Sequence, residues 1–123
     1  MHNYLGIVIE NSLRQPDAIS QSIIKTRRRG SWTFLLVSVP ENELDAHIRR
    51  LQANMVTDDE WYAHYFRGDE LIVVFRDAAF PVAVDPASWG PAVTYGLSVG
   101  VPAEQLDFTP RTAPDAEAFF TTN

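Results

Sequence analysis

His64 is the residue of this chain with the strongest case for chemistry. It lies in the run Trp61-Tyr62-Ala63-His64-Tyr65-Phe66, whose aromatic composition predicts a β-strand. Side chains alternate between the two faces of a strand, so Tyr62, His64 and Phe66 should share one face. A neutral imidazole exchanges protons near pH 7, and beside Tyr62 and a carboxylate it could act as a general acid or base.

Three functions remain open for this face. The first is binding of a small molecule or a protein, and for it Tyr62, His64 and Phe66 are the candidate contact residues; no residue is assigned as catalytic. The alternative is a cofactor-independent enzyme with His64 as general acid or base and Tyr62 or Asp69 assisting. The third is a homodimer formed through the face. Against all three stands a purely structural His64, half-buried and hydrogen-bonded across a hairpin.

A serine-hydrolase pattern is present but lacks its partners. Gly96-Leu97-Ser98-Val99-Gly100 matches Gly-x-Ser-x-Gly, in which a strand-to-helix turn exposes the serine. Here the pattern ends a predicted helix, and none of the three histidines (His2, His47, His64) follows it. We interpret the two glycines as allowing close packing and ending the helix.

Charged clusters give no metal or nucleic-acid signature. Asp58-Asp59-Glu60 lacks the glycine-punctuated spacing of a calcium loop and is interpreted as a solvated acidic loop. No second His and no Cys stands at metal-ligand spacing, so neither a metal nor another cofactor is expected. Arg27-Arg28-Arg29 is interpreted as a solvated turn, because three cations are a weak footprint in an acidic protein. His47, beside an apolar helix stripe, is interpreted as a boundary residue.

Composition indicates one globular domain. The chain has 123 residues, 46% of them hydrophobic, and its 10 basic and 16 acidic residues give a net charge of −6. That charge disfavours binding to nucleic acid and to anionic membrane surfaces. Cysteine is absent, and no apolar run approaches the ~20 residues of a membrane span. A cytoplasmic protein is therefore expected.

Hydrophobic periodicity predicts the elements that position these residues. Strand-type runs occupy residues 4–9, 23–26, 32–39, 61–66, 70–76 and 80–84, with Gly30 in the turn of the first hairpin. Leu44, Ile48, Leu51 and Met55 recur at helical spacing. A second helix is expected from the N-cap Ser88 to about Val99, with Gly100 as its stop.

This order of elements predicts an α+β fold. We expect a two-layer sandwich, a mainly antiparallel sheet with the two main helices on one face. A ferredoxin-like topology fits if strand 4–9 takes the place of the last strand. Residues 1–108 are expected to form the domain and residues 109–123 a C-terminal tail. In that tail 115–120 either forms a helical turn docked by Phe119 or Phe120 or hangs free.

Several short motifs resemble those of a known group of proteins. They are Trp61-Tyr62 with His64, Val73-Val74-Phe75, Ser88-Trp89, Tyr95-Gly96, and Gly100-Val101-Pro102-Ala103-Glu104-Gln105-Leu106-Asp107-Phe108, together with Glu10-Asn11-Ser12-Leu13. In this pattern, the chain to Phe108 resembles a group of small uncharacterised bacterial and archaeal proteins. It departs from them at Gly90-Pro91, where they have ordinary helix formers. The resemblance implies a shared fold and no particular activity.

Overall fold

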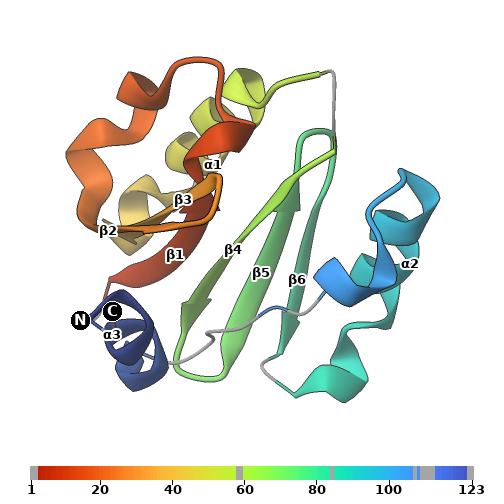
Figure 1. The fold of residues 1–123 in the computed structure, drawn as a ribbon. Helices are drawn as coiled ribbons and strands as arrows, with labels where there is room; N and C mark the ends of the chain where they lie inside the picture. Colours follow the sequence, from red (N-terminus) through yellow and green to blue (C-terminus); the bar gives the residue numbers. More distant parts are fainter. Residues whose placement is uncertain (1–2, 58–59, 84, 107, 109–112, 122–123) are drawn as a thin grey trace.

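A six-stranded antiparallel sheet forms the centre of the molecule (Figure 1). The computed structural model describes residues 3–57, 60–83, 85–106, 108 and 113–121. The strands in these ranges are β1 (Tyr4–Ile9), β2 (Ile23–Arg29), β3 (Trp32–Val39), β4 (Tyr62–Arg67), β5 (Glu70–Phe75) and β6 (Ala79–Ala83), in the spatial order β2-β3-β1-β4-β5-β6. The α-helices are α1 (Leu44–Asn54), α2 (Gly90–Ser98) and α3 (Ala113–Thr121). The predicted α+β class is confirmed.

The predicted strands are present, most of them within one or two residues of their expected bounds. β2 and β3 form the expected hairpin, and β4 and β5 form another. The turn glycines Gly30 and Gly68 have φ angles of 60° and 61°, a conformation that other residues rarely adopt. Residues 79–83 pair with β5 as the third strand of this meander.

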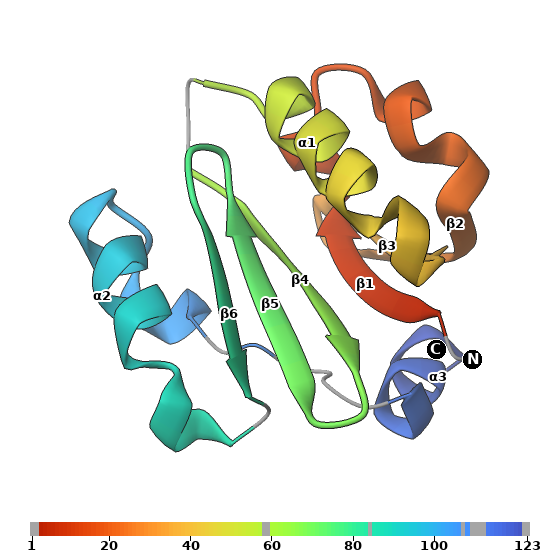
Figure 2. The same ribbon diagram turned by 180° about the vertical axis from the view of Figure 1, so that it is seen from behind.

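Both faces of the sheet are covered, which corrects the expectation that the two main helices share one face. One core cluster contains Val8 and Tyr65 from the strands and Leu51 from α1. The other contains Phe75 from the strands and Ala92 from α2. Helix α1 accordingly lies behind the sheet in Figure 1 and in front of it in Figure 2. The physical reason is that the central strands carry apolar side chains on both faces, so each face needs a cover.

The strand order does not confirm the ferredoxin-like arrangement. That topology would place the strand 32–39 between 4–9 and 70–76. In the structure β1 itself lies between β3 and β4, pairing with both. The central position suits β1 because each of its six residues is buried or half-buried, on both faces of the strand.

Helix α2 begins later than expected and ends as expected. It starts at Gly90; the Ser88 hydroxyl bonds Ala83 and the Asp85 carbonyl instead of capping it. At its end, the N–H groups of Gly100 and Val101 donate to Leu97 and Gly96, at 3.2 and 2.9 Å, with Gly100 at φ 102°. This pair of bonds is a Schellman motif. The Gly-x-Ser-x-Gly pattern is therefore a helix stop.

The predicted tail contains helix α3, which packs on the same face as α2. Its Ala116 and Phe120 are buried in that cluster, and the Phe119 ring lies edge-on to Phe34, with centroids 5.2 Å apart. Lys25 of β2 pairs with Glu117 at 2.5 Å. The expected boundary region 109–112 lies outside the described residues.

Candidate functional site

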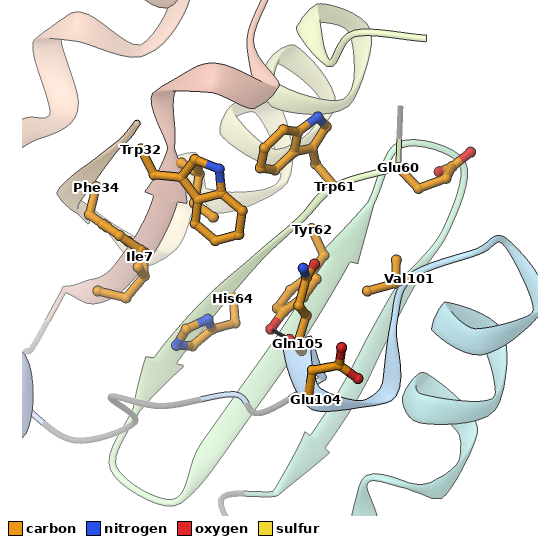
Figure 3. Close-up of a pocket in the computed structure, with 11 residues that line it drawn as sticks. Ile7, Trp32, Phe34, Glu60, Trp61, Tyr62, His64, Val101, Glu104 and Gln105 are labelled. Atoms are coloured by element: carbon orange, nitrogen blue, oxygen red, sulfur yellow. Dashed lines mark hydrogen bonds between the residues drawn. The ribbon is translucent and has the colours of Figure 1, made fainter. Parts of the chain in front are cut away.

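A pocket of about 250 Å³ opens on the face of the sheet that bears Tyr62 and His64 (Figure 3). Its apolar lining comes from β1, β3, the residue before β4 and the segment after α2: Ile7, Ile9, Trp32, Phe34, Trp61 and Val101. Tyr62, His64 and Gln105 add polar groups, and Glu60 and Glu104 add carboxylates. The volume is slightly below the range of about 300–1,000 Å³ that is usual for small-molecule sites, and an apolar lining with a few polar groups is typical of such sites.

Strand pairing explains why residues far apart in the sequence meet here. His64 of β4 lies opposite Ile7 of β1, and Ile9 lies opposite Phe34 of β3. Because paired residues share a face, the side chains of these three strands form a continuous floor. The sequence predicted that Tyr62 and His64 share a face, and both line the pocket.

Phe66, the third candidate contact residue, lies outside the pocket. It is 2% exposed and belongs to the core beneath α2 and α3. Its ring stacks on the His64 imidazole with centroids 6.0 Å apart. Phe66 therefore supports the position of His64 from the side.

His64 lies in the floor of the pocket and is nearly buried. It is 4% exposed, with Phe66 on one side and the Phe108 ring 6.5 Å away. The strand β4 that carries it pairs on both edges, with β1 and β5. β4 is therefore a central strand of the sheet, and the pocket leaves part of one of its faces accessible.

Tyr62 joins the sheet to the opposite wall. Its hydroxyl donates to the carbonyl oxygen of Gln105, which ends the 3-10 turn Ala103–Gln105. Its ring lies edge-on to Phe108, centroids 5.2 Å apart. These contacts hold the segment that carries Val101 and Glu104 against β4.

Two indoles form the rim on the other side. Trp32 and Trp61 lie 5.4 Å apart between centroids, with an angle of 66° between their planes. Both are half-buried, as is Phe34, whose ring is 6.1 Å from that of Trp32. In an edge-to-face pair of this kind, the edge of one ring packs on the face of the other.

The carboxylates give the pocket its charge. Glu60 is held by Arg76, with 3.4 Å between Oε1 and Nη2. Glu104 is exposed and has no ion-pair partner among the described residues. In Figure 3 both carboxylates lie to the right, across from Trp32 and Phe34 on the left.

The other candidates from the sequence lie elsewhere. Asp69, the suggested helper of His64, is in the β4–β5 turn and does not line the pocket. Asp58 and Asp59 lie outside the described residues; within the described ranges, no group of three or more His, Asp or Glu residues could hold a metal ion. In the same part of the chain, no helix has the length and apolar character needed to cross a membrane.

Sequence reasoning missed most of the rim. Alternation predicts that Trp32 and Phe34 share one face of their strand, but only the pairing of β3 with β1 and of β1 with β4 brings them close to His64. Trp61 was not predicted to line the site because strand alternation places it on the face opposite His64. The strand begins only at Tyr62, so alternation does not apply to Trp61. Glu104 and Gln105 were noted only as part of the motif from Gly100 to Phe108 and were not predicted to line a site.

The chain was compared with protein-family models, with curated proteins and with solved structures, and none of the three comparisons found a match. The functional argument therefore depends on the geometry of the pocket.

Proposed function

We propose that this protein is a small binding or accessory module that holds a small-molecule ligand in the pocket lined by Tyr62 and His64. The observation that carries the proposal is the pocket itself, about 250 Å³ with a mainly aromatic and aliphatic lining. A partly accessible aromatic surface costs free energy in water, and a ligand that covers it recovers that cost. The resemblance to small bacterial and archaeal proteins and the cytoplasmic location stay predictions.

A pocket-filling variant tests the proposal. Ile9 is half-buried and lines the pocket, so Ile9→Phe should occupy part of its volume. Ile24→Phe is the matched control, because Ile24 is 53% exposed on β2 and does not line the pocket. A fragment and metabolite library is screened by NMR chemical-shift mapping, with thermal shift as a second readout.

We expect hits to shift the resonances of Tyr62, His64 and Gln105 together. Ile9→Phe should weaken the binding affinity of these hits at least about tenfold, a loss of roughly 1.4 kcal/mol in binding free energy, whereas Ile24→Phe should leave the affinity unchanged. Shifts confined to α3, or hits that Ile9→Phe does not affect, would count against the proposal.

The second candidate is a cofactor-independent enzyme with His64 as general acid or base. Its support is that the imidazole lines the pocket, where a bound molecule would reach it. The Tyr62 hydroxyl is engaged with Gln105 and Asp69 is not in the pocket, so neither of the suggested helpers is arranged to assist. The variant His64→Gln distinguishes an enzyme from a binding module. If the unaltered protein converts a bound ligand chemically, and His64→Gln still binds that ligand but no longer converts it, the enzyme is supported. Homodimerisation remains a third prediction, tested by sedimentation.

A further inference from the structure

We infer that the ligand of this pocket is an organic cation, a compact alkylammonium group of the trimethylammonium type. The inference rests on the proposed function and adds the chemical class of the ligand. It follows from two properties of the lining, the aromatic rings that it contains and the sign of its charges.

The rings give the first argument. Trp32 and Trp61 line the pocket with an angle of 66° between their ring planes, and Tyr62, the first residue of β4, lines it as well. The face of an aromatic ring carries negative electrostatic potential, and tryptophan attracts cations most strongly. Aromatic rings gathered around one space are the arrangement by which proteins bind quaternary ammonium groups.

The charges give the second argument. Glu60 and Glu104 are the acidic groups of the lining, and no Arg or Lys is among the described residues that line it. The guanidinium groups of Arg27 and Arg29 lie instead over the Phe119 ring, at 4.8 and 5.8 Å from its centroid. Glu60 is shared with Arg76, which leaves Glu104 as the carboxylate placed to balance a cation. An anionic ligand would meet repulsion from the carboxylates.

Shape and polarity also fit a compact alkylammonium ion. The surface of such an ion consists of methyl groups, which suit the side chains of Ile7, Ile9 and Val101. A strongly hydrated ammonium ion would lose its water beside these side chains and would suit them less well. The inferred ligand thus combines a diffuse positive charge with methyl groups.

Three probes of nearly equal shape separate charge from size. They are choline, its neutral carbon isostere neohexyl alcohol, and the anion tert-butylacetate, each titrated into the full chain and followed by NMR shifts of the pocket residues. We expect choline to bind at least about tenfold more tightly than neohexyl alcohol, and tert-butylacetate to bind least.

Variants locate the effect. Glu104→Gln should weaken choline about two- to fivefold and leave neohexyl alcohol unchanged, as expected for loss of one exposed charge contact. Glu43→Gln, at an exposed position outside the pocket, is the control. Trp61→Leu should weaken choline at least about threefold, with partial recovery in Trp61→Phe.

The outcomes separate this inference from the proposed function. Neohexyl alcohol or tert-butylacetate binding as tightly as choline would overturn the cationic ligand and leave a binding pocket in place. Equal effects of Glu104→Gln and Glu43→Gln would overturn it too. If none of the probes shifts the pocket resonances, the cation inference fails, and the library screen with Ile9→Phe decides the proposed function independently.

Discussion

The most unusual single residue is His47, which is fully buried between α1 and the sheet. Its Nε2 lies 2.7 Å from the hydroxyl oxygen of Tyr65, which is also fully buried. Its Nδ1 has no hydrogen-bond partner among the described residues. The interpretation of His47 as a boundary residue was wrong. The available signal was its spacing of three from Leu44 and four to Leu51, the two buried leucines of the helix.

Removing the Tyr65 hydroxyl should destabilise the fold. Tyr65→Phe leaves both ring nitrogens of His47 buried without a partner, which costs about 1–3 kcal/mol. Urea denaturation measures the change in the free energy of unfolding. Tyr95→Phe serves as control, because Tyr95 is half-buried in the opposite cluster. A loss in Tyr65→Phe no larger than in the control would contradict the prediction.

His47 should also make stability depend on pH. Burial, with a smaller contribution from Arg50, lowers the pKa of His47 from 6.5 to about 4. In the unfolded chain the imidazole takes up a proton as the pH falls through 6.5, whereas in the fold it remains neutral until about 4. The unfolded state therefore binds more protons in this window, and stability falls as the pH falls. Well above pH 6.5 the group is neutral in both states, and its contribution no longer changes with pH.

The size of this effect can be measured by denaturation at a series of pH values. Between about pH 7.5 and about pH 5, His47 should lower the free energy of unfolding by about 2 kcal/mol. His47→Gln should flatten the curve over this interval, whatever its effect at the upper end. Identical slopes in the two proteins would show that His47 does not titrate as its burial implies.

At the scale of elements, local patterns predicted what each segment forms, and pairing between distant segments decided what they build. Alternation in residues 4–9 and 61–66 and the helical stripe beginning at Leu44 depend on near neighbours, so they could be read directly. The insertion of β1 between β3 and β4 joins segments about 60 residues apart, and no local pattern encodes that choice. The rim of the pocket was missed for the same reason.

Gly6 of β1 permits one of these pairings. A Cβ at Gly6 would stand 2.4 Å from the Tyr65 ring and 2.9 Å from Val37 Cγ2, both buried. The bulky ring of Tyr65 thus needs the space that the absent side chain leaves. The β1–β4 contact depends on one small residue beside one large residue.

Gly6→Ala should therefore destabilise the protein. Forcing a methyl group into this packed contact costs about 1–3 kcal/mol, measured as a shift of the urea midpoint at constant slope. Gly90→Ala is the matched control, since its added methyl group meets nothing within 4 Å and its φ is not positive. That variant should be neutral or stabilise by about 0.4–1 kcal/mol. If the two variants change the free energy of unfolding equally, the Tyr65 side chain can move aside without cost and the prediction is wrong.

At the scale of the whole molecule, both faces of the sheet are covered by helices. The two edge strands, β2 and β6, are then the strands at which a second molecule could pair with the sheet. β6 contains Pro81, which cannot donate to a ladder, and β2 carries Lys25 and Arg27 to Arg29. Both features discourage edge-to-edge association. On the face with α2, the cover is completed by α3, whose Phe120 and Ala116 are buried.

The position of α3 makes a prediction about the domain boundary drawn at Phe108. Ending the chain there would expose the surface that Phe120 and Phe119 cover and remove the Lys25–Glu117 pair. Burial of the Phe120 side chain contributes about 1.5–3 kcal/mol, so the shortened chain should lose about 2–4 kcal/mol of unfolding free energy. Thermal and urea denaturation of the chain 1–108 and of the full chain measure this difference. A single cooperative transition at lower stability would make α3 part of the domain. If the transition of the chain 1–108 is unchanged, the predicted boundary at Phe108 is correct and residues 109–123 are a tail, because a helix that can be removed without loss of stability contributes no net stability to the sheet.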